Sequence, residues 1–289
     1  MKTFDGLRLD VRTYGPEDAP LTAVLAHCWT LNQSDWHYQI RDLQREFGHR
    51  IRIVTWDHRG HGQSDHAPRH DCTIANLARD MSDVIDTYAP QGMLVLAGHS
   101  IGGMTMMALA RQRPELFDRV VGAAFISTSS GQLDTITLGL PEMGPFLRSQ
   151  IPHALALRSR TLTKKARRRA PIIERLIIRT LLFGTPMRLA DAALTVEGLI
   201  NSPGTTMVGF YQDCLKHEAV DALKVYDGIP THVLVGTRDV LTPPAHARRI
   251  ADNIEDSVLT IVPDAGHMLP LERDELVSGM LIRLIRPHL

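Results

Sequence analysis

Three side chains of this 289-residue sequence have the types and the chain order needed for nucleophilic catalysis: Ser100, Asp239 and His267. A serine hydroxyl is a poor nucleophile near neutral pH, so it needs an adjacent histidine as base and a carboxylate that orients the histidine. On an open α/β sheet these residues occur in the order serine, acid, histidine, as they do here. The pattern predicts acyl transfer through a covalent serine intermediate.

Ser100 lies in the pentapeptide Gly98-His99-Ser100-Ile101-Gly102, between an apolar run typical of a buried strand and another typical of a buried helix. In this context G-x-S-x-G predicts a nucleophile elbow, a turn so sharp that side chains two residues before and after the serine would collide. Glycine at both positions removes the Cβ atoms concerned. We therefore expect the turn to raise the serine hydroxyl above the sheet.

The candidate acid and base each follow a strand-like run. Asp239 comes just after residues 231–236, and His267 comes one loop after residues 258–262. Parallel sheets place ligands and chemistry beyond the carboxyl ends of their strands. Three separate strand ends would therefore carry Ser100, Asp239 and His267, in the expected order, at one edge of the sheet.

Two backbone N–H groups are the expected donors of an oxyanion hole, which stabilises the negative oxygen of a tetrahedral intermediate. One is that of Ile101, the residue after the nucleophile, and the other is that of Trp29, in the loop after the strand-like run 21–26. In hydrolases with a nucleophile elbow, an early strand–helix loop supplies this second donor.

These motifs resemble those of the α/β-hydrolase superfamily, in particular its lid-bearing serine esterases and lipases. The resemblance covers most of the chain except its middle. The family usually has glycine where this chain has Cys28, so we expect an added Cβ and a thiol beside the nucleophile. The segments that carry the resemblance are His27-Cys28-Trp29, Asp57 to Ser64, Gly98 to Gly102, Gly236 to Pro243 and Asp264 to His267.

The resemblance implies an α/β fold with a mostly parallel eight-stranded sheet, flanked by helices and carrying a helical cap insertion. Strand–helix alternation with almost continuous apolar strands supports a mostly parallel sheet covered on both faces. Residues 4–14 alternate in polarity and predict an antiparallel hairpin edge. Further strands are expected near 21–26, 51–56, 93–97, 120–126, 231–236 and 257–262, and helices near 34–46, 74–88, 101–112, 244–253 and 272–285.

The interval 131–225 breaks this alternation and contains six prolines. The expected domain organisation is a core made of residues 1–130 and 226–289, with residues 131–225 as a cap inserted after the sixth strand. Most apolar cap residues are expected to pack the cap onto the core, and some to wall the cleft. Candidate pocket residues are Cys28, Leu138, Phe146, Met207 and Phe210.

Residues 158–179 carry nine basic side chains and one acidic side chain. A basic amphipathic helix could lie on an anionic membrane surface or attract acidic substrates. The alternative, which we favour, is a solvated face whose arginine stems cover apolar surface.

Composition excludes several other classes of function. Equal numbers of basic and acidic residues, 32 of each, give no general affinity for nucleic acid. Three cysteines are too few for a disulfide framework. The sequence shows neither a signal-peptide pattern nor an apolar run near the roughly 18 residues of a membrane span, so a soluble, cytoplasmic protein is expected. The oligomeric state is not indicated.

No metal or other cofactor is expected. His27, His58, His61 and His99 crowd the motif loops, but their spacing matches no metal-binding helix motif. The family resemblance gives them the role of hydrogen-bonding residues that shape these loops.

Two other carboxylates compete with Asp239 for the role of triad acid. Asp264 is too near His267 in the sequence to reach it from another strand end. Asp134 is the stronger alternative, because some lipases of this fold take their acid from the region after the sixth strand. We expect Asp239 to be the acid.

The function expected from these observations is hydrolysis of a small-molecule ester through an acyl-enzyme on Ser100. The same triad supports cleavage of thioesters, lactones, amides and C–C bonds, and perhydrolase-type chemistry. A ligand receptor with slow turnover is an alternative from a different class, since fold alone does not settle function. Epoxide hydrolases and haloalkane dehalogenases are disfavoured, because they place aspartate where this chain has Ser100.

Overall fold

The computed structural model describes residues 1–135, 146, 149–150, 153, 175–176 and 178–289. Its sheet has the strand order β1-β3-β2-β4-β5-β6-β7. Only β1 runs antiparallel to its neighbour among these strands, and the other pairs are parallel. The strands are β1 (Val11–Tyr14), β2 (Leu21–Ala26), β3 (Arg52–Trp56), β4 (Met93–His99), β5 (Val120–Ile126), β6 (Thr231–Gly236) and β7 (Val258–Val262).

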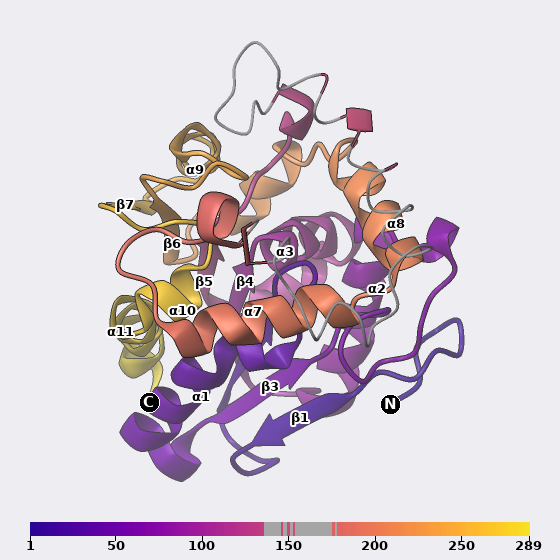
Figure 1. Ribbon diagram of the computed structural model, residues 1–289. Helices are drawn as coiled ribbons and strands as arrows, with labels where there is room; N and C mark the ends of the chain where they lie inside the picture. Colours follow the sequence, from indigo (N-terminus) through magenta and orange to yellow (C-terminus); the bar gives the residue numbers. More distant parts are fainter. Residues whose placement is uncertain (136–145, 147–148, 151–152, 154–174, 177) are drawn as a thin grey trace.

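Helices cover both faces of the sheet (Figure 1). On one face α1 and α11 pack against inward side chains of β2 such as Leu21 and Leu25. On the other face α2, α3 and α9 contribute to the apolar cluster that contains Val24 and Ala26, with α9 packed against β6 and β7. The helices of this core are α1 (His37–Phe47), α2 (Ile74–Tyr88), α3 (Ile101–Gln112), α9 (Pro244–Ala251), α10 (Leu269–Glu272) and α11 (Asp274–Ile285).

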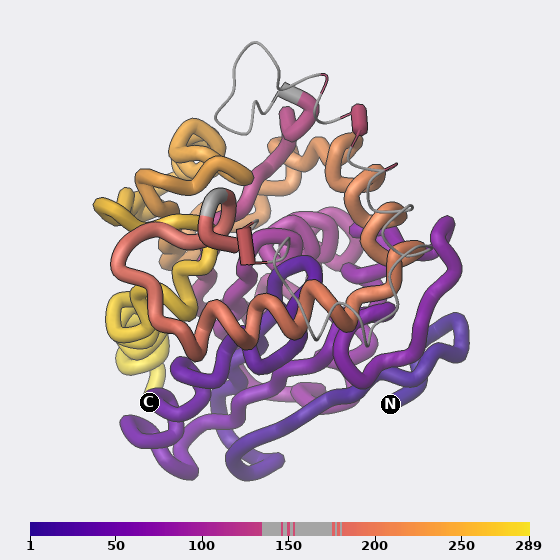
Figure 2. Tube along the Cα trace, in the orientation of Figure 1, coloured from indigo at the N-terminus to yellow at the C-terminus, as the bar shows by residue number. Residues whose placement is uncertain are grey.

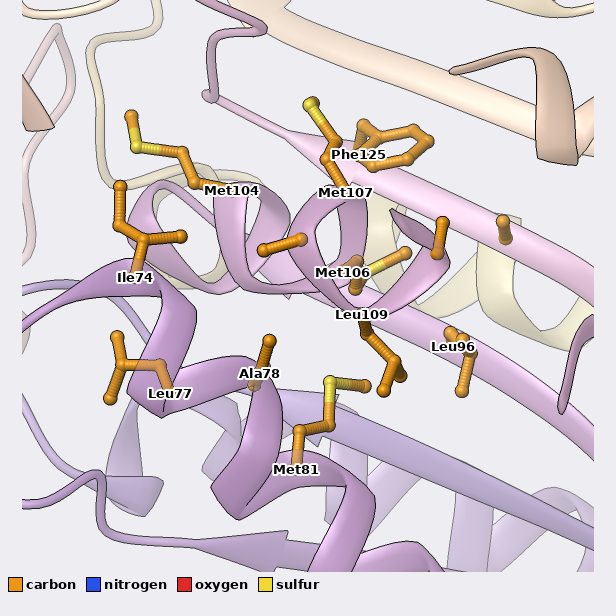
Figure 3. Close-up of a cluster of buried hydrophobic side chains, with 14 of the residues drawn as sticks. Ile74, Leu77, Ala78, Met81, Leu96, Met104, Met106, Met107, Leu109 and Phe125 are labelled. Carbon is orange, nitrogen blue, oxygen red and sulfur yellow. The ribbon is translucent and has the colours of Figure 1, made fainter. Parts of the chain in front are cut away.

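The contact between α2 and α3 holds the helix that follows the nucleophile motif. In Figure 3 side chains of both helices enter one apolar cluster, which also takes in Leu96 of β4 and Phe125 of β5. Fully buried side chains such as Met106 and Leu109 each stabilise the fold by about 1.5–3 kcal/mol relative to the exposed state. The start of α3 is therefore fixed by the core.

The chain leaves the sheet after β5 and returns at β6. The described part of this excursion contains a π-helical turn (Ile178–Leu182), α7 (Leu189–Asn201) and α8 (Gly204–Cys214), the last two drawn in orange in Figure 2. Ser202, at the end of α7, donates a hydrogen bond to the carbonyl of Thr30, and the Tyr211 ring of α8 stacks on Trp29. Both helices thus lie against the loop that follows β2.

Short 3-10 segments complete the secondary structure of the described residues. None of the helices in these ranges has the length and apolar character needed to cross a bilayer. The 3-10 segments are Gln33–Trp36, Gly48–Arg50, Arg69–Asp71, Pro114–Arg119, Leu133–Thr135, Asp221–Tyr226 and Arg286–His288.

The sequence-based expectation of a mostly parallel, helix-flanked sheet is confirmed, but the expected eighth strand is absent from the described residues. The N-terminal hairpin is reduced to one bridge between Lys2 and Arg8, with Gly6 at a positive φ in the turn between them. The chain then forms β1, which pairs with β3 instead.

Two of the expected helices begin at residues suited to a helix start. The Thr73 hydroxyl accepts a hydrogen bond from the Asn76 N–H, 3.1 Å away, and so caps α2. Pro244 opens α9, where its fixed φ and missing N–H are tolerated.

Candidate active site

Ser100 stands between the last residue of β4 and the first of α3, with φ 56° and ψ −116°. Such a φ is uncommon for any residue other than glycine. Its N–H donates to the carbonyl of Ile126, at 2.9 Å, and its own carbonyl accepts the hydroxyl of Thr128, at 2.6 Å. The sharp turn is therefore held from β5 and from the loop that follows it.

The two glycines of the motif are required by close approach. A Cβ on Gly98 would overlap the backbone of Gly102 and Gly103, and a Cβ on Gly102 would overlap the carbonyl of Ala26. The turn thus has the backbone geometry that the G-x-S-x-G pattern predicts.

Asp239 and His267 are in contact at the same edge of the sheet. Nδ1 of His267 lies 2.8 Å from Oδ2 of Asp239, and both side chains are buried. The other carboxylate oxygen accepts the N–H groups of Leu241 and Thr242, each at 2.9 Å, and the Thr242 hydroxyl donates to Oδ2. Four donors therefore fix the direction of this carboxylate.

These contacts keep the Asp239 carboxylate ionised. Burial, the largest influence, acts to raise the pKa of Asp239, but the charge and hydrogen bond of His267 and the bonds from Thr242 outweigh it and lower the pKa. An ionised Asp239 keeps the Nδ1–H of His267 directed at itself. Nε2 of His267 is then left with the lone pair that a base needs.

His99 ties the histidine loop to the serine turn. Its Nε2 lies 2.9 Å from the backbone carbonyl of His267, and the two rings are 5.3 Å apart between centroids. No direct hydrogen bond joins Ser100 to His267 among the described residues, and such catalytic contacts often close only when substrate binds. The structure thus brings Asp239 and His267 together and fixes His267 beside the residue that precedes Ser100.

The loop after β2 carries the first expected oxyanion donor. The N–H of Cys28 donates to Asp35, at 3.1 Å, whereas the N–H of Trp29 donates to none of the described residues. The N–H of Ile101, at the first position of α3, belongs to the set that a helix leaves unpaired. Both expected donors are therefore available.

The added Cβ of Cys28 causes no backbone strain, because Cys28 does not have a positive φ. The residue of this loop that has a left-handed backbone is Thr30, with φ 66°. The Cys28 thiol is buried and donates to the carbonyl of Trp29. Burial, assisted by the nearby carboxylates Asp35 and Asp239, raises the pKa of this thiol well above its usual value. Cys28 is thus a neutral neighbour of the site.

Asp264 and Asp134, the two alternatives to Asp239 as triad acid, do not bond to His267 among the described residues. Asp264 is 62% exposed at its side chain and pairs with Arg238, and Asp134 is exposed. Neither contacts His267 within the described parts of the chain.

The remaining loop histidines are hydrogen-bonding residues. The N–H of His58 donates to Nε2 of His27, at 2.8 Å, and Nδ1 of His61 meets the carbonyl of Arg59. Burial, the largest influence, lowers the pKa of His27 and His58 well below the usual value, so both rings are neutral.

Cys28, Asp35 and His99 could offer ligand atoms to a metal, since these atoms lie within 4.8 Å of one another. Asp35 and His99 are, however, hydrogen-bonded directly at 2.7 Å, and the same carboxylate oxygen accepts the Cys28 N–H. The three residues thus form a hydrogen-bond network through Oδ2 of Asp35, whereas Oδ1 of Asp35 is buried without a partner among the described residues.

Glu272 and Asp35 are residues around the site that the sequence analysis missed. The Glu272 carboxylate accepts the N–H groups of Gly266 and Met268, on either side of His267, and that of Gly184. Neither acid stands in a recognisable motif, and each bonds to a distant segment: Asp35 to His99 and Glu272 to Gly184.

A pocket of about 820 Å³ lies between the π-helical turn and α7. Three of its wall residues, Ile178, Val196 and Ile200, belong to the same apolar cluster as Cys28 and Met268, which flank the site. The pocket thus shares an apolar cluster with residues that flank the site, although no triad residue lines it. Its lining residues are Arg175, Ile178, Arg179, Met187, Leu189, Ala192, Ala193, Val196, Glu197 and Ile200.

Of the pocket residues expected from the sequence, the four that the structure describes do not line this pocket: Cys28, Phe146, Met207 and Phe210. Phe210 is fully buried and packs against His61, with ring centroids 5.5 Å apart, and Met207 is buried as well. Phe146 is 62% exposed, and Leu138 lies outside the described residues. The basic segment 158–179 also lies outside them, apart from Arg175, Leu176, Ile178 and Arg179.

Comparison with known proteins places the chain in a family. A profile of the alpha/beta hydrolase family matches residues 23–279. The chain belongs to this family and is a hydrolase of it.

Individual relatives are more distant. Proline iminopeptidase PfmaB of Pestalotiopsis fici is 24% identical, over 99% of this chain and 97% of its own length. A thermophilic esterase from Thermogutta terrifontis has a TM-score of 0.75 at 23% identity, covering 99% of this chain and 96% of that one. The enol-lactonase of Burkholderia xenovorans has a TM-score of 0.74 at 23% identity, covering 97% of each chain. The two solved structures share the fold with this protein.

Proposed function

We propose that this hydrolase cleaves carboxylic esters of small organic molecules through an acyl-enzyme on Ser100. The observation that carries the proposal is the buried Asp239–His267 pair, which His99 anchors beside the serine turn. A carboxylate, an oriented imidazole and a serine on a nucleophile elbow form the set that activates a hydroxyl for attack.

In the proposed reaction Nε2 of His267 takes the proton of Ser100 as the serine oxygen attacks the ester carbonyl. The N–H groups of Trp29 and Ile101 stabilise the resulting oxyanion. His267 then gives its proton to the leaving alcohol, and the acyl-enzyme forms. Water, deprotonated by His267, hydrolyses that intermediate and returns the serine hydroxyl. Asp239 remains ionised throughout and stabilises the imidazolium.

The substrate we propose has an apolar acyl group. Ile178, Met187, Val196 and Ile200 give the pocket between the π-helical turn and α7 an apolar wall, which suits such a group. Residues 131–225 would act as the cap that closes over it. The esterase and the enol-lactonase that share the fold support an ester or lactone as the bond cleaved.

A series of p-nitrophenyl esters of increasing acyl length tests this function. We expect hydrolysis with an initial burst of nitrophenol equal to the enzyme concentration, wherever deacylation is slower than acylation. The Ser100→Ala protein is the matched control and should give no burst. Absence of hydrolysis of any ester and any lactone by folded wild-type protein would overturn the proposal.

A further inference from the structure

We propose that Asp35 and His99 form a charged positioning pair that sets the distance between the oxyanion loop and the catalytic histidine. The proposal rests on the function proposed above. It gives a positioning role to two buried residues that do not touch the reacting atoms.

The pair lies at the centre of a chain of hydrogen bonds. Oδ2 of Asp35 accepts the N–H of Cys28, at 3.1 Å, and meets Nδ1 of His99, at 2.7 Å. Nε2 of His99 in turn meets the backbone carbonyl of His267, at 2.9 Å. The loop before Trp29, the turn before Ser100 and the loop of the base are therefore joined through two side chains.

The partners of His99 determine its protonation. A carboxylate oxygen and a peptide carbonyl only accept hydrogen bonds, so both ring nitrogens must donate. A ring with two N–H groups is an imidazolium. His99 and Asp35 are each fully buried, and Asp35 has no other ion-pair partner among the described residues. The positive ring is thus the counter-charge of the buried carboxylate.

The other groups around His99 agree with this charge. Burial is the largest influence on His99 and acts to lower its pKa, but the charge of Asp35, both hydrogen bonds and the charge of Asp239 outweigh burial and raise the pKa. His27 and Cys28, which also face the cluster, are neutral. The ring of His267 packs at 5.3 Å between centroids.

Two amide substitutions at His99 test its two hydrogen bonds one at a time, the bond to Asp35 and the bond to the carbonyl of His267. In His99→Gln the side-chain amide nitrogen reaches the position of Nε2 and can still donate to the carbonyl of His267. In His99→Asn the amide nitrogen reaches the position of Nδ1 and can donate only to Asp35. Both variants lose the positive charge and each keeps one hydrogen bond: His99→Gln keeps the bond to the histidine loop, and His99→Asn keeps the bond to Asp35.

We expect kcat for p-nitrophenyl esters to fall about 10- to 100-fold further in His99→Asn than in His99→Gln, because small displacements of a catalytic group have effects of this size. KM should be similar in both. Asp35→Asn should also lower kcat, since it removes the counter-charge of His99. Asp80→Asn is the control for general destabilisation, because Asp80 is equally buried and pairs with Arg59, whose side chain bonds to Asp80 and Asp5 and not to Asp35 or His99.

Equal kcat in the two His99 variants, or losses that follow the fall in Tm as in Asp80→Asn, would overturn the proposal. Side-chain nitrogen chemical shifts of wild-type His99 provide a measurement that needs no variant. Two protonated nitrogens at pH 7.5 are expected, and a neutral ring would contradict the inference. An inactive but folded wild-type protein would instead refute the proposed ester hydrolysis, which keeps the two failures distinct.

Discussion

Nδ1 of His267 lies 2.8 Å from Oδ2 of Asp239, although 28 positions of the chain separate the two residues. The contact forms because β6 and β7 are parallel neighbours, so the loops that follow them leave the same edge of the sheet. The backbone N–H of Arg238 also donates to the carbonyl of Ala265, which ties the two loops together directly.

This contact leads to a prediction for the triad. Ser100→Ala and His267→Ala should each lower kcat about 10⁴- to 10⁶-fold, and the double variant should be little worse, because the residues act as a unit. Asp239→Asn should have a smaller effect. Steady-state kinetics on a p-nitrophenyl ester measure these losses. Near-native activity of Asp239→Asn together with an inactive Asp134→Asn would show that the acid is misassigned.

The buried thiol beside the site should react slowly. Because burial raises the pKa of Cys28, little thiolate is present at pH 7, and iodoacetamide should modify it more slowly than a free cysteine. Prolonged modification should slow ester hydrolysis by crowding the oxyanion loop. Cys28→Ala should be active and resistant to the reagent. Full inhibition of Cys28→Ala would mean that another cysteine, or unfolding, is responsible.

Buried neutral histidines make stability depend on pH. Burial lowers the pKa of His61 from 6.5 to about 4, so between these values the unfolded chain binds a proton that the folded protein does not. The free energy of unfolding should therefore fall as pH drops from 6.5 to 4, by about 3 kcal/mol from this residue alone. His27 and His58 act in the same direction.

Urea unfolding at pH 7 and pH 4.5 measures this effect. His61→Asn is the matched variant, because its amide can still donate to the carbonyl of Arg59 but does not titrate. Its stability should depend less on pH than that of the wild type. The same pH dependence in both proteins would count against the assignment.

The two arginines of the pocket should select for charge. Arg175 and Arg179 line it and are exposed, so each contributes modestly, about 1 kcal/mol or less. Replacing both with glutamine should raise KM about fivefold for an ester whose acyl chain ends in a carboxylate. KM for a neutral ester of the same length should not change. Arg248→Gln, on the exposed side of α9, is the control.

Added salt should reproduce this selective loss in the wild-type protein, because it screens exposed charges. Equal changes in KM for the charged and the neutral ester would contradict a role for the two arginines.

The elements that carry the triad could be predicted from the sequence because they depend on local patterns. The apolar runs at 120–126 and 231–236 and the helical pattern at 74–88 predicted bounds that agree with β5, β6 and α2. The G-x-S-x-G pattern predicted the nucleophile elbow. Its two glycines are required because the backbone of the turn approaches itself at Gly98 and approaches β2 at Gly102.

Other features depend on contacts between distant loops and could not be predicted in this way. Asp35 acts on His99, 64 positions away, and Glu272 acts on Gly184, 88 positions away. Neither acid stands in a recognisable motif. Phe210 was expected near substrate because of its type, but only the tertiary packing of α8 shows that it faces the core.

The central claim is that Ser100 is the nucleophile, and covalent labelling tests it most directly. A fluorophosphonate should modify folded wild-type protein at one equivalent, and mass spectrometry of the digested protein should locate the adduct on the peptide that contains Ser100. His267→Ala should be labelled far more slowly, because the base that activates the hydroxyl is missing. An adduct on any other residue, or no adduct on a protein that hydrolyses esters, would contradict the account.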